Sequence, residues 1–148
     1  MRPANFPLPI LAVLLVAASL AARADPPALT VTDAWVRAVP GAPTAAAYMT
    51  LHNGGTQPLR ITGVRSPLAG MAMIHETTIA GGISTMRAHA GLDIAPGATV
   101  RLAPEGLHIM LSDLAHPLAV GTPVPLELLL EGGGRVALEA RVRPLSAE

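Results

Sequence analysis

The sequence predicts an all-β domain of sandwich or barrel type, and three observations lead to this fold class. No helical period of hydrophobic residues runs for any length past the N-terminal segment. Short runs of aliphatic and β-branched residues recur instead, separated by Gly, Pro and Asn. The chain has 148 residues, 51% of them hydrophobic, which is enough for one sizeable core in a single domain. Because it contains one Trp, one Tyr and one Phe, this core must be aliphatic.

Residues 1–24 have the features of a cleaved secretory signal peptide. A positive charge at Arg2 precedes an apolar run from about Pro9 to Leu20, and Ala22 and Ala24 form an A-x-A site before residue 25. The run is short for a bilayer span, so a retained anchor is the less favoured interpretation. Cleavage removes two of the ten arginines and leaves all ten acidic residues, so residues 25–148 carry a formal charge of −2.

Nine runs between turn-forming residues are predicted as strands, at the regular spacing that is typical of sandwiches and barrels. In chain order they span Leu29–Arg37, Ala45–His52, Leu59–Val64, Ala72–Thr78, Ile83–His89, Thr99–Ala103, Leu107–Leu111, Val124–Glu131 and Arg135–Val142.

The first two predicted strands supply core residues. Alternation within TVTDAWVRA predicts that Trp35 is the one large aromatic anchor of the core. Met49 lies in the apolar run AYMTL and is expected to be buried. Asn53-Gly54-Gly55 tolerates positive φ and predicts a hairpin turn after the second strand.

The fourth and fifth predicted strands form a hairpin around Gly81 and Gly82. If its turn is two residues, Ala80-Gly81 or Gly81-Gly82, then His75 and Met86 share one face, either directly opposite or diagonal. A three-residue loop without a bulge would put them on opposite faces. Met73 shares the face of His75, whereas Met71 is expected in the preceding loop.

The run GLHIML, residues 106–111, raises the question of function. On a strand, His108 and Met110 share one face, while Leu107, Ile109 and Leu111 fill the other. One face is therefore core, and the other carries two soft donor atoms. The last predicted strand follows a turn at Gly132-Gly133-Gly134, and its ALEARVR alternation indicates one solvated face.

Two imidazoles and two thioethers, from His75, Met86, His108 and Met110, form a donor set suited to Cu(I). Thioether sulfur is soft and binds monovalent copper, whereas Ca²⁺ and Mg²⁺ take oxygen ligands. The chain has no cysteine, which excludes disulfides, a blue-copper centre and a Cys-anchored lipoprotein. Thioethers, unlike thiols, cannot be lost to disulfides in an oxidising compartment.

Other function classes find little support in the sequence. Ten arginines balance ten acidic residues without a basic-aromatic cluster, so nucleic acid and anionic membrane are poor partners. No nucleophile elbow, paired acid and base, or zinc-protease motif is present, so an enzyme is not expected. Glu76 follows His75 but points to the opposite face, as an exposed or paired carboxylate, and His89 is an edge position.

The spacing His75, ten residues, Met86, twenty-one residues, His108, one residue, Met110 resembles the signature of the periplasmic copper chaperones called PCuAC. The resemblance extends through DAWVRAVPG, AAAYMTLHN and IHETT. It implies a cupredoxin-like, Greek-key β-barrel that binds one Cu(I) per chain at a shallow site formed by these four residues. Some members also carry a His- and Met-rich C-terminal extension proposed to hold Cu(II), which this chain lacks.

The resemblance implies a periplasmic chaperone that delivers copper for assembly of the CuA centre of cytochrome c oxidase. Its acceptor would be subunit II of the oxidase or an assembly factor, and we expect a monomer that does not insert into the membrane after signal cleavage. Two alternatives stay open: a periplasmic copper scavenging or storage protein, and a metal-free, immunoglobulin-like secreted binding module.

Overall fold

Ten β-strands account for most of residues 28–146, the part of the chain that this computed structural model describes, and no helix occurs among them. The predicted all-β class is confirmed, and each of the nine predicted strands is present with shifts of a few residues at its ends. The predicted signal peptide, residues 1–24, lies outside the described residues. The strands are β1 (Leu29–Ala38), β2 (Ala45–Asn53), β3 (Leu59–Arg65), β4 (Ala69–Ala80), β5 (Ile83–Ala88), β6 (Leu92–Ile94), β7 (Thr99–Leu102), β8 (Leu107–Leu114), β9 (Pro123–Leu130) and β10 (Arg135–Arg143).

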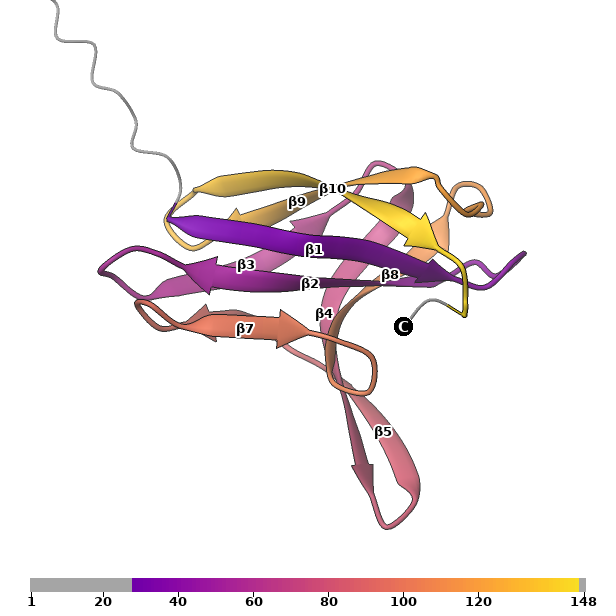
Figure 1. The fold of residues 1–148 in the computed structure, drawn as a ribbon, viewed down its shortest axis with the longest axis horizontal. Coiled ribbons are helices and arrows are strands. Elements are labelled where there is room, and N and C mark those ends of the chain that lie inside the picture. The colour runs from indigo at the N-terminus through magenta and orange to yellow at the C-terminus, as the bar shows by residue number, and fades with distance from the viewer. Residues whose placement is uncertain (1–27, 147–148) are drawn as a thin grey trace, which may run out of the picture.

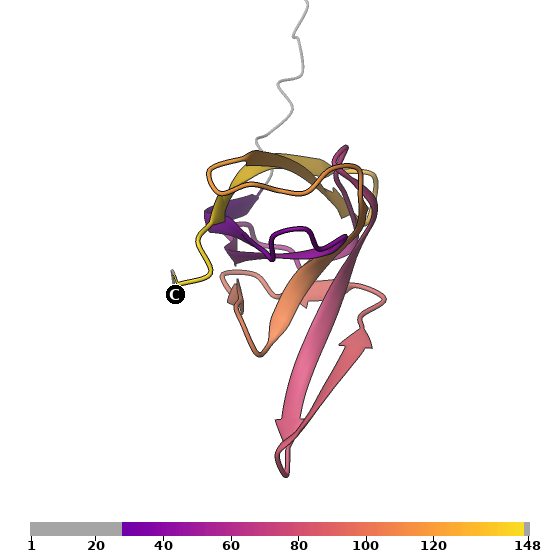
Figure 2. The ribbon, with the colours of Figure 1, turned by 90° about the vertical axis from the view of Figure 1, so that its right-hand side faces the viewer.

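The strands form one sheet that curls around a central core, in the order β5-β4-β8-β2-β1-β10-β9-β3-β6, with β7 paired to β2 (Figure 1). Only the β1–β10 pair is parallel among the described pairs. The β4–β5 hairpin extends away from the rest of the molecule in both views (Figures 1 and 2). Within residues 28–146 there is no helix of the length and apolarity that crossing a membrane requires.

The core is aliphatic, as the composition predicts. It contains side chains from the inner face of the curled sheet, including Met49, Leu51, Ile61, Ile109 and Leu128, each 1% exposed or less. Alternating residues of β8 enter it: Ile109 and Leu111 are buried on the inner face. Tight packing of branched side chains against one another gives the sheet its stability and leaves its outer face free to carry polar groups.

Trp35 does not lie in the core, and the prediction that it is the core anchor is wrong. A bulge between Thr32 and Trp35 breaks the β1–β2 register, and Asp33 there adopts a left-handed φ of 52°. The extra residue reverses the alternation, so that Val36 and Ala38 point inward in place of Trp35. The indole lies half-buried on the outer face of β1, where it contacts Tyr48.

The Asn53-Gly54-Gly55 segment is not a hairpin turn, contrary to prediction. β2 pairs with β1, β7 and β8, whereas β3 pairs with β6 and β9, so the chain crosses from one part of the sheet to another. Asn53 is fully buried and its amide Nδ2 donates to the carbonyls of Gln57 and Ile94. These hydrogen bonds connect the crossover to β6. The sequence did not predict β6, because three residues are too few to show an alternating pattern.

The Gly81-Gly82 turn of the β4–β5 hairpin agrees with the prediction of a two-residue turn. Ala80 pairs with Ile83, and both glycines have positive φ, 59° and 77°, which is the backbone that a type I′ turn requires. The resulting register pairs His75 with Ala88 and Thr77 with Met86. His75 and Met86 are therefore diagonal neighbours on one face, the second of the two arrangements expected.

Candidate metal centre

The outer faces of β4 and β8 carry three of the four predicted donors side by side: His75, His108 and Met110. β4 runs antiparallel to β8 with His75 opposite His108 and Met73 opposite Met110. Residues directly opposite in such a pair bring their Cβ atoms to about 5 Å, so the two strands place two imidazoles and two thioethers on one patch. The imidazole rings of His75 and His108 meet edge to face with 5.8 Å between centroids.

Met86 reaches this patch from β5. Its Sδ lies 3.3 Å from Nδ1 of His75, across the diagonal that the Gly81-Gly82 turn creates. Two donors on one tetrahedral ion, with bonds of about 2.0 Å to nitrogen and about 2.3 Å to sulfur, are separated by about 3.5 Å. The observed separation is close to this value, so the distance between the nitrogen and the sulfur is compatible with both binding the same ion.

His108 is the buried member of the cluster, 4% exposed, and its ring orientation is fixed by a backbone carbonyl. Its Nδ1 lies 3.0 Å from the carbonyl oxygen of Gly106. Because a carbonyl oxygen only accepts hydrogen bonds, Nδ1 must carry the proton and Nε2 the free lone pair. The same carbonyl accepts a hydrogen bond from the backbone N–H of Thr77 on β4, at 3.0 Å. The β7–β8 turn thus selects the tautomer and ties it to the neighbouring strand.

The pKa of His75 is lowered from the ordinary histidine value of 6.5. Burial of the ring is the larger cause, and repulsion between the charged forms of His75 and His108 is the smaller one. Both causes favour the neutral imidazole, which is the form that binds a metal. At neutral pH His75 is therefore in the protonation state that a metal ion at this candidate centre would require.

Met71 lies on β4 and not in the preceding loop, which corrects the prediction for this residue. β4 begins at Ala69 because its pairing with β8 continues as far as Leu114. Met71 consequently shares the outer face with Met73 and His75. Both methionines are well exposed, 51% for Met71 and 39% for Met73, so the patch carries more thioethers than the four-residue motif contains.

Glu76 and His89 lie apart from this patch and bond to each other. Nε2 of His89 is 2.9 Å from the Glu76 carboxylate. This agrees with the prediction that Glu76 is a paired carboxylate pointing away from His75. His52 is exposed on β2 and bonds Thr99, and His116 follows the end of β8. Within residues 28–146 no group of three or more His, Asp or Glu side chains gathers as a metal site.

Tyr48 is a neighbour of the candidate centre that sequence reasoning missed. Its ring lies between Trp35, at 4.6 Å between centroids, and His108, at 6.4 Å. Burial raises the pKa of the Tyr48 hydroxyl, and the nearby Arg37 opposes part of this effect. No sequence signal could have placed Tyr48 here, because the β1–β2 and β2–β8 pairings that surround it join distant segments of the chain.

The family can be assigned from comparison with known proteins. The profile of the family described as “Putative lipoprotein LpqE-like” matches residues 29–142. The chain belongs to the LpqE-like family. A Leifsonia xyli relative named “Putative lipoprotein Lxx21020” is 34% identical over 117 residues, which is 78% of this chain and 70% of the relative. These names suggest an exported protein of the cell envelope.

Among solved structures, this LpqE-like chain resembles PCuAC domains. Solution structures of DR1885 from Deinococcus radiodurans match in the apo form, at 35% identity and TM-score 0.63 over 99% of this chain and 96% of that one. Its CuI form matches at 34% identity and TM-score 0.64, over 88% and 87%. The copper-bound PCuAC domain from PmoF2 matches at 27% identity and TM-score 0.65, over 78% and 92%.

These similarities confirm the cupredoxin-like β-barrel that the resemblance implied. They support membership of the PCuAC group and a copper-binding, chaperone-like domain. The names of the LpqE-like relatives contain the word lipoprotein, whereas the sequence of this chain contains no cysteine to which a lipid could be attached.

Proposed function

We propose that this protein is an exported Cu(I) chaperone that binds one Cu(I) per chain through His75, Met86, His108 and Met110. The observation that carries the proposal is the meeting of three separate strands at one patch, with 3.3 Å between the His75 nitrogen and the Met86 sulfur. Two neutral imidazoles with two thioethers suit a monovalent soft ion better than Zn²⁺, Ca²⁺ or Mg²⁺. The copper-bound PCuAC relatives support the same metal.

Exposure of the Met86 donor favours delivery over storage. Met86 is 49% exposed and lies on a hairpin that projects from the barrel (Figure 2). An acceptor's ligands can approach the ion from this side before the chaperone's own ligands leave. We infer that the acceptor is the CuA centre of cytochrome c oxidase, reached through subunit II or an assembly factor, and that delivery takes place in the periplasm after removal of residues 1–24.

Copper binding is tested by anaerobic titration of residues 25–148 with Cu(I) in competition with a coloured Cu(I) chelator. We expect one tight equivalent per chain. Met110→Leu keeps the side-chain volume but removes the sulfur, and should weaken binding by at least about tenfold, or ~1.4 kcal/mol. His52→Gln, which changes an exposed histidine away from the patch, should leave the affinity unchanged. Binding that is absent, or indifferent to Met110, would favour the metal-free binding module.

Delivery is tested separately by mixing the Cu(I)-loaded protein with a copper-free soluble CuA domain and separating the two. Copper in the acceptor fraction, at a rate that rises with acceptor concentration, is the result expected for direct transfer. Copper that stays with the chaperone, or moves only at the rate of spontaneous dissociation, would instead indicate storage or scavenging.

A further inference from the structure

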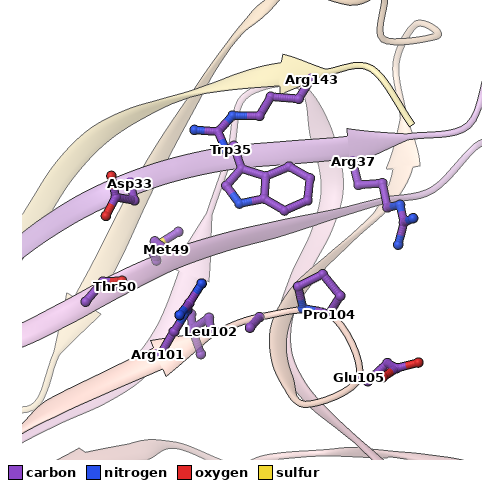
Figure 3. A pocket seen from close by; sticks show the side chains of 11 residues that line it. Asp33, Trp35, Arg37, Met49, Thr50, Arg101, Leu102, Pro104, Glu105 and Arg143 are labelled. Atoms are coloured by element: carbon purple, nitrogen blue, oxygen red, sulfur yellow. The ribbon is translucent and has the colours of Figure 1, made fainter. Parts of the chain in front are cut away.

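A cavity of about 720 Å³ lies on the outer face of β1, β2, β7 and β10, outside the proposed copper ligands (Figure 3). Trp35 and Arg37 of β1, Arg143 of β10 and Arg101 of β7 line it, together with the β7–β8 turn at residues 103–105. Its volume is within the range of small-molecule sites in proteins. None of the four proposed ligands of copper lines this cavity.

Within the described part of the chain, the three arginines of the cavity form no ion pair. The ion pairs formed among residues 28–146 use Arg60, Arg135, Arg141 and His89, and none uses Arg37, Arg101 or Arg143. The parallel register even places Arg37 beside Arg143 on the same face of adjacent strands. Their guanidinium groups point to different sides of Trp35 in Figure 3, so each can contact a different part of one anion.

Two carboxylates, Asp33 and Glu105, also line the cavity but do not neutralise it. They lie toward opposite ends in Figure 3, and neither forms an ion pair within the described chain. Three guanidinium groups against two carboxylates leave an excess of positive charge, spread over three different strands.

The walls between the arginines are partly apolar. Leu102 and Pro104 line the cavity below the Trp35 indole in Figure 3. Arg143 covers the indole with its guanidinium carbon 5.2 Å from the ring centroid, a cation–π contact, while Arg101 lies on the other side of the open space. The guanidinium groups are therefore separate from one another, with carbon surface between them.

We propose that this cavity binds a small organic polycarboxylate. A guanidinium group matches a carboxylate through two parallel N–H···O bonds, and three separate groups match an anion with several carboxylates better than a single inorganic ion. The carbon skeleton of such a ligand would rest on the apolar wall. This site needs no copper, so it stands or fails independently of the proposed function.

Trp35 provides the readout, because it is the only tryptophan of the chain and lines the cavity. Citrate is titrated into the copper-free protein at constant ionic strength, and Trp35 fluorescence and heat release are both recorded. We expect saturable binding of one citrate, with a Kd below about 1 mM. Arg101→Gln, at an exposed position of β7 that does not touch the indole in Figure 3, should weaken binding by at least about tenfold without lowering the melting temperature.

Arg135→Gln is the matched control, since Arg135 is also exposed on a strand but lies outside the cavity. It should bind citrate as the unaltered protein does. A tetraglutamate peptide is tested in the same way. If the peptide shows saturable, Arg101-dependent binding and citrate does not, the site recognises an acidic protein segment and the proposal is overturned. Equal responses to citrate, phosphate and chloride, or a citrate response that survives Arg101→Gln, would overturn it too.

Discussion

At the scale of single residues, the two histidines of the proposed copper site differ in what keeps a ring nitrogen free to bind a metal. His108 is buried and its tautomer is selected by the Gly106 carbonyl, so its Nε2 lone pair is free whenever the ring is neutral. His75 is less buried, and its lowered pKa, caused first by burial and then by His108, keeps it unprotonated. The lowered pKa of His75 reduces competition between protons and a metal ion at that ring, whereas the tautomer of His108 determines which nitrogen can bind the ion.

The lowered pKa of His75 predicts a pH dependence of stability. Above pH 6.5 the ring is neutral in both the folded and the unfolded chain and contributes nothing. As the pH falls through 6.5, the unfolded chain binds a proton first, so the free energy of unfolding decreases. Imidazole signals from NMR of the copper-free protein should show His75 titrating below 6.5, and His75→Gln should lose less stability on acidification. Titration at or above 6.5 would contradict the assignment.

Met73 and Met110 face each other across β4 and β8, yet we expect them to differ in function. Four donors complete a tetrahedral Cu(I) site, so the thioether of Met73 is surplus when Met110 is present. Met73→Leu should lower the Cu(I) affinity by less than about threefold, against at least about tenfold for Met110→Leu. Chelator competition measures both variants under the same conditions. Equal losses would show that the two sulfurs share the ion.

At the scale of elements, the β4–β5 hairpin has little contact with the core of the described barrel. Every residue of β5 is exposed, so the hairpin is held by its own ladder and by the turn, with little core beneath it. Two-stranded hairpins of this kind are marginally stable alone. The position of Met86 therefore depends on the turn at Gly81 and Gly82.

Gly82→Ala should loosen the hairpin. Gly82 has φ of 77°, a conformation that costs an alanine about 1 kcal/mol, although the added methyl meets no atom within 4 Å. Amide hydrogen exchange in β5 should speed up roughly fivefold, as this free energy implies, and Cu(I) affinity should fall with it. The melting temperature of the barrel should change little.

Gly41→Ala is the control for this change, because Gly41 has the same φ of 77° and equally open surroundings but lies in the β1–β2 turn. It should leave exchange in β5 and copper affinity unaltered. If both variants reduce the affinity equally, the effect does not come from the hairpin.

At the scale of the whole molecule, the core and the donor patch are on opposite sides of the same strands. The aliphatic core is complete without any metal, since the buried aliphatic residues Ile74, Ile109 and Leu111 alternate along β4 and β8 with the proposed ligands. Copper binding should then add to the stability of a barrel that already folds, and not be required for folding.

Leu51→Ala tests where the stability of the copper-free barrel comes from. Leu51 is fully buried, and removing its side chain should lower the free energy of unfolding by about 2–5 kcal/mol. Ile83→Ala, at a 70% exposed position on the hairpin, should change it by no more than about 0.5 kcal/mol. Denaturant unfolding of both variants without copper makes the comparison. A non-cooperative transition in the unaltered copper-free protein would contradict a self-sufficient core.

Local alternation made most of the strands and the faces of β8 predictable from sequence. Alternation gave the wrong faces for β1, because the extra residue at the bulge by Asp33 exchanges the inner and outer faces. No residue type in this segment predicts the bulge. The prediction placed Met71 in a loop because the first residues of β4 are held in a strand by their pairing with β8, a segment far away in sequence. The arginine cavity depends on the parallel β1–β10 pair, which joins the two ends of the described chain and leaves no local pattern.

If Met86 binds copper as proposed, the projecting hairpin makes it a tethered ligand. In the proposed copper complex, the Met86 sulfur would compete with the thioether of an acceptor for the same position on the ion. Because Met86 is attached to the barrel, its effective concentration would depend on how often the hairpin opens. Each opening would leave three ligands on the barrel and one vacant position on the ion. The rate of copper exchange would then depend on the stiffness of the β4–β5 hairpin, and could change without any change to the atoms that bind the metal.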